Sequence, residues 1–510
     1  MGLATVIFVV LVIGVLIIVD SVARLKGHDL SKLHEWGLGG RQFGLLMSWF
    51  LVGGDVYTAY TFIAVPALMF GVGALAYFAV SYTLMANIVL FAIFPKLWRV
   101  SAKYGYVTGA EFVRARYGNR LLALAIGITG ILATVPYIAL QLVGMQTVLG
   151  ALGFTGTGLG AHLPLIMAVT LVALFTVTSG LRAVAMVSVV KNLLIFLTVI
   201  VGIIVIPAEL GGFGAVFGKL PAGHLVLAHP PAGSAGLYSG YATLALGSAM
   251  ALFLYPHTMT GVLAARSRDV VRRNAFLLPA FSLMLGLIAL FGVMAVAAGV
   301  NKIPEFAKGF RDYGPNFSLP ALLIHSLPGW FVGIAFAAIA IGALVPAAIM
   351  GIAAANIFTR DIWRQFIAPS MSQGLESLIA KLFAIAIIIG GLVFEVGLPL
   401  KYAIQLQLLG GMWIIQTFPA VAFSLFTRFY NGWALLIGWT VGFGMATYLA
   451  LLNHLTGAIY AFDLFGYTVP CYIALVTFCV NVVIASALSP LFHRIASDRS
   501  RDMTVASDYA

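Results

Sequence analysis

A carboxylate follows a pair of glycines inside one of the longest apolar stretches of the chain. In residues 43–70, Asp55 comes directly after Gly53 and Gly54. Adjacent glycines weaken a helix by about 1 kcal/mol each, and a carboxylate in apolar surroundings needs a partner. A helix interrupted here would expose backbone carbonyl and N–H groups, which can bind ions. The alternative interpretation is a packing site for two helices, with Asp55 bonded to a neighbouring side chain.

A proline creates a second interruption, in residues 241–264. Pro256 lacks the N–H group that a helix interior requires, and Tyr255 and His257 stand on either side of it. An ordinary proline kink with a satisfied histidine is the alternative interpretation. The distance along the chain between the two interruptions leaves room for two repeated units, each opening with a broken helix.

The polar groups around the two interruptions are candidate substrate ligands. The N–H groups near Tyr57 and Thr58 would begin the second half of the first broken helix, where the helix dipole favours a carboxylate. The candidate set is Tyr57, Thr58, Tyr255, His257, Gln405 and Gln407. The two glutamines could equally well pair two helices. The nine histidines show no metal-ligand spacing, so we expect neither a metal site nor a catalytic centre.

The composition explains why these few polar residues stand out. Hydrophobic residues make up 62% of the 510 residues and charged residues 9%, whereas soluble proteins carry about 25% charged residues. A water-soluble fold could not bury this much apolar surface. The apolar stretches approach the ~20 residues that cross a bilayer and are apolar on all sides, which favours helices over barrel strands. The sequence therefore predicts an all-α membrane protein in contact with lipid.

Thirteen stretches are predicted to span the membrane. They are 3–19, 43–70, 72–94, 121–149, 163–178, 185–206, 241–264, 275–298, 331–358, 378–396, 403–426, 433–452 and 472–491. With the N-terminus outside and the C-terminus inside, the outer loops hold Lys219, Lys302, Lys308, Arg311 and Lys401, and the other 23 of the 28 Lys and Arg are cytoplasmic. This asymmetry follows the positive-inside rule. The net charge of +12 therefore orients the chain and does not indicate nucleic-acid binding.

Several short motifs resemble those of the sodium:solute symporter family, in matching order and spacing. They are Gly39–Arg41 before span two, Asp55 at the interruption, Gly180–Val184 before span six, Leu263–Arg266 after span seven and Thr359–Ile362 after span nine. Within the family, the segments around Asp55 and Pro256 look most similar to bacterial monocarboxylate permeases. The resemblance implies a leucine-transporter-type fold with two inverted five-helix repeats and sodium-coupled solute uptake.

The resemblance also implies a cation site that this sequence fills incompletely. The family's sodium site combines span-two carbonyls, here Gly53 and Val56, with span-nine hydroxyls. The matching span-nine stretch is Ala348–Ile352, in which Gly351 and Ile352 carry no side-chain oxygen. Sodium is a hard cation that requires oxygen ligands, so losing two of them weakens the site.

A lysine appears where the family usually has a glutamine. Near the start of span six, Ser188 and Lys191 occupy the positions of an aspartate and a glutamine three residues later. A buried ammonium could replace the sodium ion and, once desolvated, take up and release a proton. We therefore expect Gly53, Asp55, Val56 and Lys191 to form the coupling site, with H⁺ or Na⁺ as the coupling ion. The alternative is that Lys191 extends to the cytoplasmic interface.

The sequence as a whole predicts one transport domain. Residues 1–42 add a first helix and loop, 43–206 and 241–428 form the inverted repeats, 433–492 add two helices, and 493–510 form a polar, mobile cytoplasmic tail. We expect a symporter in the plasma (bacterial inner) membrane that takes up small monocarboxylates such as lactate or pyruvate. Other small solutes, such as an amino acid or a vitamin-like acid, are the alternative substrates. A channel, a membrane enzyme and a sensor are less consistent with the sequence, which shows no repeated pore filter, no catalytic cluster and no signalling module.

Overall fold

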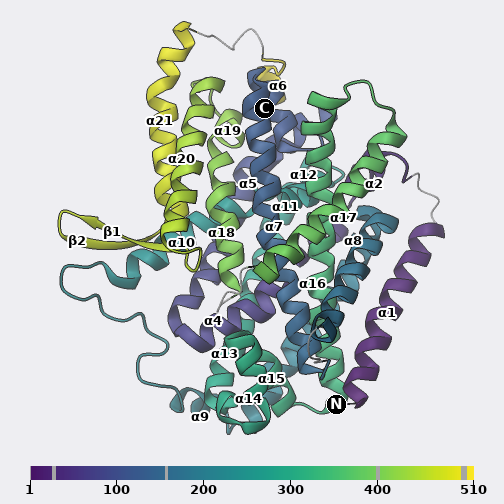
Figure 1. The fold of residues 1–510 in the computed structure, drawn as a ribbon, viewed down its shortest axis with the longest axis vertical. Helices are drawn as coiled ribbons and strands as arrows, with labels where there is room; N and C mark the ends of the chain where they lie inside the picture. Colours follow the sequence, from purple (N-terminus) through teal and green to yellow (C-terminus); the bar gives the residue numbers. More distant parts are fainter. Residues whose placement is uncertain (1, 26–29, 155–158, 398–402, 496–501, 510) are drawn as a thin grey trace.

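The computed structural model describes residues 2–25, 30–154, 159–397, 403–495 and 502–509. Four charges used above to orient the chain, Lys26, Lys401, Arg499 and Arg501, lie outside these ranges. The described chain is a bundle of mostly parallel and antiparallel helices (Figure 1). Ten of its helices are long and apolar enough to cross a membrane, or eleven when the bent pair α10–α11 is taken as one span. This confirms a polytopic helical membrane protein, and the count of thirteen spans stays a prediction.

The helices of the first half bring most of the candidate residues into the bundle. They are α1 (Gly2–Leu25), α2 (Leu33–Leu38), η1 (Gly39–Arg41), α3 (Leu45–Val56), η2 (Tyr60–Ala64), α4 (Val65–Val72), η3 (Gly73–Tyr77), α5 (Phe78–Tyr104), α6 (Gly109–Tyr117), α7 (Arg120–Ala151), α8 (Leu159–Glu209) and α9 (Phe213–Gly218). Helix α8 is two helices joined at Gly180, which has φ 64° and ψ −177°. A positive φ is accessible to glycine at little cost, so the Gly180 motif marks a turn between two spans.

The second half repeats the use of a broken helix. Its elements are α10 (Gly236–Leu252), α11 (Pro256–Leu263), α12 (Arg268–Leu277), α13 (Pro279–Ala298), η4 (Val300–Lys302), η5 (Pro304–Phe306), α14 (Ala307–Tyr313), η6 (Gly314–Phe317), α15 (Ser318–Ser326), α16 (Gly329–Ile357), η7 (Phe358–Ile367), α17 (Gln373–Gly397), α18 (Ile404–Ile414), η8 (Ile415–Thr417), α19 (Phe418–Val421), η9 (Phe423–Leu425), α20 (Gly432–Leu452), β1 (Ile459–Leu464), β2 (Tyr467–Tyr472), α21 (Ile473–Ile495) and η11 (Ala506–Asp508). Helices α10 and α11 meet at 48°. Pro256 begins α11 and does not kink a continuous helix, because the first turn needs no proline N–H.

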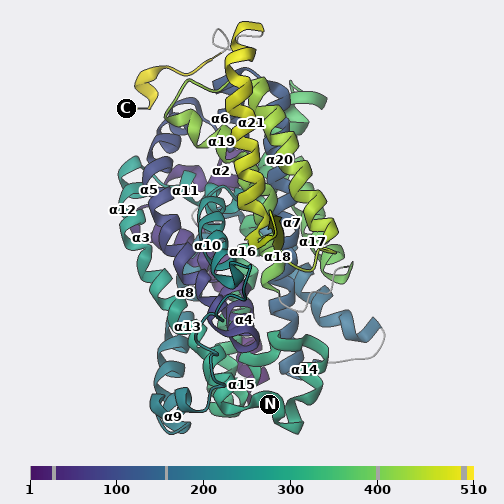
Figure 2. The ribbon, with the colours of Figure 1, turned by 90° about the vertical axis from the view of Figure 1, so that its left-hand side faces the viewer.

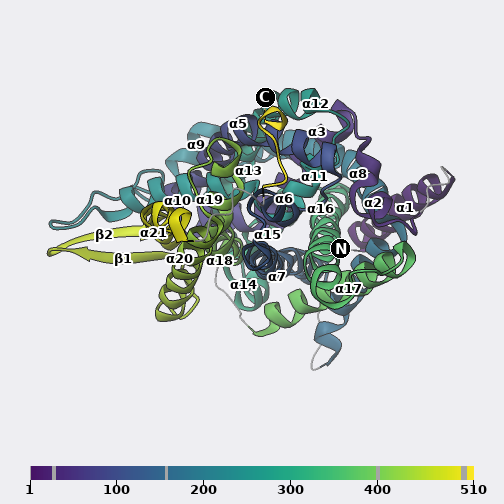
Figure 3. The ribbon, with the colours of Figure 1, turned by 90° about the horizontal axis from the view of Figure 1, so that it is seen from above.

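Helices α7 and α16 lie at the centre of the bundle (Figures 1 and 3). Helix α16 packs against α1, α7, α8 and α17, whereas α7 also contacts α18. Helix α16 is buried along almost its whole length, so it forms the core against which the two broken helices are held. Helix α1 begins near the lower end in Figure 1 and the C-terminal segment lies near the upper end, opposite ends of the bundle.

A two-stranded hairpin is an element that the all-helical prediction missed. Strands β1 and β2 pair antiparallel, with Ile459 opposite Tyr472, and project from the side of the bundle near α10 and α21 (Figures 1 and 3). Phe465 and Gly466 form the turn with φ of 56° and 84°. Two positive φ values match the twist of a hairpin, but the Phe-Gly pair is a weak sequence signal for such a turn.

The C-terminal segment packs on the bundle, whereas the sequence suggested a mobile tail. Within residues 502–509, the N–H of Met503 donates to the carbonyl of Ala115 at 2.9 Å. The Asp502 carboxylate pairs with Arg116, whose side chain is 4% exposed. These contacts fasten the segment to helix α6, at the end of the bundle shown uppermost in Figure 2.

A second carboxylate attaches the same segment to α5. Asp508 accepts from the Lys103 ammonium at 2.5 Å and from the Tyr104 hydroxyl at 3.0 Å. Burial works to raise the pKa of the Asp508 carboxyl, but the hydrogen bonds from Lys103, from the Val505 N–H and from Tyr104 together hold that pKa below its ordinary value. A lowered folded-state pKa contributes stability above the unfolded-state pKa, and this contribution is lost as the pH falls through the folded-state value.

Replacing Asp502 with alanine should lower the apparent melting temperature of the detergent-solubilised protein. The substitution leaves the Arg116 guanidinium buried without its anionic partner, and an unpaired buried polar group costs about 1–3 kcal/mol. Arg428→Ala is the matched control, because Arg428 is 57% exposed and lies 3.7 Å from the same carboxylate. Equal melting temperatures for Asp502→Ala and Arg428→Ala would show that the segment is not fastened in this way.

Candidate functional site

The first broken helix is interrupted two residues beyond Asp55. Helix α3 continues through Gly53 and Gly54 and ends at Val56, and Tyr57 leaves the helical region with φ −90° and ψ 86°. Helical structure resumes as the continuous stretch η2–α4. The expectation that the glycine pair itself forms the break was therefore wrong.

The two glycines provide space for neighbouring helices. A Cβ atom on Gly53 would lie 2.3 Å from the ring of Phe281, and one on Gly54 would lie 2.4 Å from the side-chain amide of Asn192. The Asn192 amide donates to the carbonyl of Phe50 at 2.9 Å. Both positions need glycine because α8 and α13 approach the backbone of α3 too closely for a side chain.

The ammonium of Lys191 lies against the break. Its Nζ atom donates to the carbonyl of Gly54 at 2.5 Å and to the carbonyl of Tyr57 at 2.9 Å. The side chain is completely buried, so the alternative in which it extends to the interface is wrong. Bonds from an ammonium to carbonyls are charge-assisted and stronger than neutral ones. Lys191 thus joins α8 to the two halves of the broken helix.

The carbonyls that meet Lys191 are not those predicted from the family resemblance. The prediction named Gly53 and Val56, whereas the structure uses the carbonyls one residue later in each case, with the spacing of three kept. The carbonyl of Val56 instead accepts a short hydrogen bond from the Thr61 hydroxyl. The shift arises because the helix breaks later than the glycine pair suggests.

The part of α16 that approaches the break is also not the stretch Ala348–Ile352 named from the family resemblance. A Cβ atom on Gly351 would contact Ile388 of α17 at 3.2 Å, so Gly351 faces away from the break. The residue of α16 that comes near the break is Gly342, whose Cβ position lies 3.9 Å from the Tyr57 carbonyl oxygen. One turn further on this face stand Val345 and Pro346. They also lack hydroxyls, so the shortage of oxygen ligands remains.

Asp55 and His257 connect the two broken helices. The His257 Nε2 atom lies 3.6 Å from Asp55 Oδ2, and both side chains are at most 4% exposed. Within the described residues, neither the two carboxylate oxygens nor the two ring nitrogens have a hydrogen-bond partner. Buried polar groups normally have partners. This unpaired set is therefore the part of the interior best suited to a polar ligand or a transported proton.

An aromatic cluster continues from His257 toward α18. The ring of Tyr137 on α7 lies 5.1 Å from the ring of His257 and 5.2 Å from that of Tyr255. The Tyr255 hydroxyl donates to the carbonyl of Gln407 at 2.8 Å. The side-chain amide of Gln407 is buried, and both of its polar atoms lack partners among the residues that the structure describes.

Two predicted ligands point elsewhere. The Tyr57 hydroxyl donates to the carbonyl of Phe281 at 3.0 Å, and its ring packs on Phe281 and Phe196. The Gln405 amide oxygen accepts from the N–H of Ala458, just before the hairpin, at 3.2 Å. The structure therefore brings Tyr255, His257 and Gln407 together and does not bring Tyr57 or Gln405 to them.

Helix α7 contributes a residue that the sequence analysis missed. The side-chain oxygen of Gln141 accepts from the N–H of Ala59 at 3.0 Å, and its amide nitrogen donates to the carbonyl of Tyr137 at 3.3 Å. Gln141 is fully buried. An amide inside the apolar span 121–149 was a signal that could have identified it.

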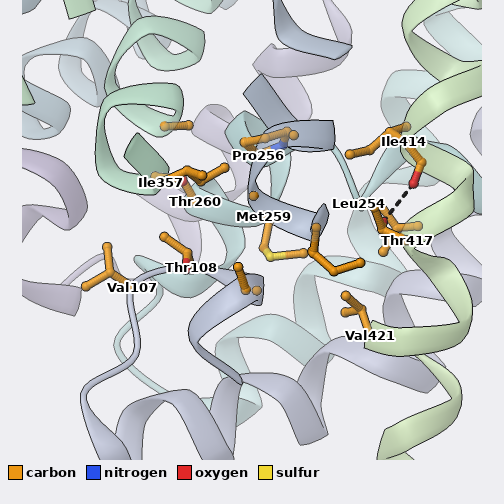
Figure 4. A pocket seen from close by; sticks show the side chains of 16 residues that line it. Val107, Thr108, Leu254, Pro256, Met259, Thr260, Ile357, Ile414, Thr417 and Val421 are labelled. Atoms are coloured by element: carbon orange, nitrogen blue, oxygen red, sulfur yellow. Dashed lines mark hydrogen bonds between the residues drawn. The ribbon is translucent and has the colours of Figure 1, made fainter. Parts of the chain in front are cut away.

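A cavity of about 30 Å³ lies between the second break and helix α6. Figure 4 shows Pro256, Met259 and Thr260 of α11 at this cavity, with Thr108 and Ile357 on one side and Ile414 and Thr417 on the other. This volume admits a water molecule but no organic solute. In this conformation an organic solute therefore cannot reach the two breaks through the cavity on the α6 side.

Polar contacts close the same end of the bundle. The Thr108 hydroxyl donates to Asp361 at 2.7 Å, and Arg360 pairs with Glu376 at 2.7 Å. These residues belong to or contact the motif at Thr359–Ile362. The Arg182 guanidinium pairs with Glu35 at 3.0 Å nearby in the motif that follows Gly180. No group of three or more potential metal ligands occurs in the parts of the chain that are described.

The family assignment agrees with this architecture. The profile of the sodium:solute symporter family matches residues 36–430. The chain belongs to the sodium:solute symporter family. It is 44% identical over 496 residues to a monocarboxylate transport permease protein of Rhizobium johnstonii (strain DSM 114642 / LMG 32736 / 3841), with 96% of each chain covered. It is 33% identical to the uncharacterized symporter YodF of Bacillus subtilis (strain 168), with 88% of each chain covered.

A solved structure shares the fold. A Na⁺-coupled sialic acid symporter in a substrate-bound outward-open state superposes with a TM-score of 0.73, at 16% identity, over 96% of this chain and 98% of that chain. Membership in the family makes this protein a cation-coupled solute symporter. The groups around the two breaks are the candidate polar contacts for the solute and the cation.

We expect Asp55→Asn to reduce solute uptake by about tenfold or more, because it removes the buried charge that faces both His257 and the Lys191 region. The variant keeps the size of the side chain, so folding should be preserved. Initial uptake rates in proteoliposomes measure the effect, with Asp312→Asn on the peripheral helix α14 as the control. Unchanged uptake by Asp55→Asn at equal protein content would contradict a role for this carboxylate.

Proposed function

We propose that this symporter carries small monocarboxylates such as lactate or pyruvate into the cell together with protons. The observation that carries the proposal is the position of Lys191, whose buried ammonium donates to the carbonyls of Gly54 and Tyr57 at the break in the first helix. Two carbonyls spaced by three residues at a helix break are suited to a cation. The lysine side chain stays attached to the protein, so the ion that can bind and be released at this position is its proton.

The charges near the break support coupling to one proton per monocarboxylate. The Asp55 carboxylate lies within electrostatic range of Lys191, so the ammonium and the carboxylate compensate one another when both are charged. A bound monocarboxylate adds one negative charge, and protonation of Lys191 adds one positive charge, so the loaded and the empty carrier have the same net charge. Burying an uncompensated charge costs several kcal/mol, so taking up the proton together with the anion avoids that cost in the loaded carrier.

The unpaired groups support a carboxylate-bearing substrate. His257 and the side-chain amide of Gln407 offer buried donors without partners in the described structure, and both lie against the aromatic cluster of Tyr137 and Tyr255. A small acid with a short apolar group fits a site of this kind, since the amide and the imidazole can bind its oxygens. The relative from Rhizobium johnstonii, described as a monocarboxylate transport permease protein, is consistent with this substrate class.

The conformational step follows from what Lys191 holds. While protonated, it links α8 to both halves of the broken helix through two charge-assisted bonds. Loss of its proton to the cytoplasm leaves a neutral amine whose hydrogen bonds to the two carbonyls are no longer charge-assisted, and this weakening allows α3 and η2 to move relative to α8. The end near α6 would then open, and the substrate would leave through the region of the cavity in Figure 4.

The proposal includes the finer topology. We count thirteen spans by taking α3 with η2–α4 as one broken span, dividing α8 at Gly180 and counting α10–α11 once. Residues 43–206 and 241–428 then form two inverted repeats. The N-terminus lies outside and the C-terminus inside a plasma or bacterial inner membrane. The protein needs no cofactor and carries out no enzymatic reaction.

Uptake of radiolabelled pyruvate or L-lactate into proteoliposomes tests this function. We expect accumulation when the lumen is alkaline without sodium, and no accumulation from a sodium gradient at equal pH. Lys191→Gln should abolish the pH-driven accumulation and spare exchange of substrate for substrate. Lys381→Gln is the control, because Lys381 donates to the carbonyl of Leu30 away from the break. Sodium-driven accumulation at equal pH that persists in Lys191→Gln would contradict proton coupling, and failure of the wild type to take up either acid would contradict the substrate class.

A further inference from the structure

The second half of the first broken helix begins with donors that are already occupied. Helical structure from Tyr60 to Val72 is continuous over η2 and α4. The N–H of Tyr60 donates to the Thr58 hydroxyl at 2.9 Å, and the N–H groups of Thr61 and Phe62 donate to the carbonyl of Thr58 at 3.1 and 3.2 Å. Thr58 therefore caps the helix that was expected to receive the substrate carboxylate.

The remaining donor at this helix start is taken by a side chain from another helix. The N–H of Ala59 donates to the amide oxygen of Gln141 on α7 at 3.0 Å. Helix α7 reaches this point because Gly144 lacks a side chain, since a Cβ atom there would lie 2.3 Å from the Cβ of Ala59. The backbones are thus held together by packing, and the Gln141 hydrogen bond can open without separating the helices.

The same glutamine is connected to the unpaired groups of the second repeat. Its amide nitrogen donates to the carbonyl of Tyr137, whose ring contacts His257 at 5.1 Å. Both ring nitrogens of His257 and both amide atoms of Gln407 are unpartnered in the described part of the chain, and each residue is 1% exposed. Buried donors without partners indicate a polar ligand in the region around Tyr137, which lies one helical turn before Gln141 on α7.

We propose that Gln141 occupies the position of the substrate carboxylate and is displaced by it. An amide oxygen and a carboxylate oxygen accept the Ala59 N–H in the same way, but the bond to a carboxylate is charge-assisted and stronger, and the dipole at this helix start favours a negative charge. In the empty carrier the neutral Gln141 side chain accepts the hydrogen bond from the Ala59 N–H. When the substrate binds, its carboxylate replaces Gln141 as the acceptor. Gln141 thereby determines the affinity and charge selectivity of the site. This inference rests on the proposed function.

Two substitutions at this position have opposite expected effects. Gln141→Glu places a permanent anion on the Ala59 N–H that repels the substrate, so the KM for a monocarboxylate rises by about tenfold or more. Gln141→Leu has no oxygen to displace and leaves the N–H unpaired in the empty carrier, so the KM falls by about threefold. A merely structural role for Gln141 would make both variants worse, with the leucine variant at least as impaired.

The experiment measures KM and maximal rate for exchange of labelled pyruvate in proteoliposomes at constant pH. Gln146→Glu, the same substitution about 1.4 helical turns further along α7, is the matched control and should leave KM unchanged. Thermal unfolding of each purified variant verifies that the comparison is between folded carriers. Gln141→Asn is a second neutral variant, whose side chain is too short to reach Ala59. Its KM should fall as that of Gln141→Leu does.

The outcomes separate this inference from the proposed function. Absence of pyruvate exchange by the wild type contradicts the proposed substrate class. Wild-type exchange with equal KM values for Gln141→Glu and Gln141→Leu overturns the role of Gln141 and leaves the substrate class intact. A rise in KM for both variants would likewise overturn it, since that result indicates a structural contribution only.

Discussion

The break in the first helix depends on satisfying backbone carbonyls in an apolar interior. A carbonyl without a partner there costs free energy comparable to a lost hydrogen bond. The ammonium of Lys191 binds the carbonyls of Gly54 and Tyr57, and its own charge is stabilised by those oxygens and by the field of Asp55. The ammonium and the two carbonyls thus each lower the free-energy cost of burying the other.

This constraint joins the coupling site to the solute site. Asp55 follows Gly54, whose carbonyl accepts from Lys191, and lies 3.6 Å from His257 in the first turn of α11, the second half of the other broken helix. A change in the charge of Lys191 or Asp55 therefore changes the electrostatic environment of His257, which contacts the aromatic cluster. At the end marked by α6, Thr108 and Asp361 close the bundle and the segment containing Asp502 packs over α6. The conformation described here is accordingly closed on that side.

Sequence patterns predicted the helical membrane architecture, the two broken helices and the placement of Asp55 and Lys191 at the first break, because a rare polar residue in an apolar span is a strong signal. The exact carbonyls were missed, since glycines that weaken a helix also permit close packing, and Gly53 and Gly54 serve the second purpose. Gln141 could not be assigned to Ala59 because the contact joins residues 82 positions apart. The hairpin and the packed C-terminal segment depend on tertiary contacts and carry little local signal.

We infer that a proton accompanies the solute because Lys191 occupies the cation position. Luminal pH reports this directly in proteoliposomes that contain a trapped pH-sensitive dye, when an inward pyruvate gradient is imposed in sodium-free buffer at equal starting pH. Protein-free vesicles correct for diffusion of the free acid through lipid. The account predicts rapid luminal acidification with the wild-type protein and only the protein-free rate with Lys191→Gln. Acidification that is unchanged in Lys191→Gln, or pyruvate entry that moves sodium and no protons, would contradict it.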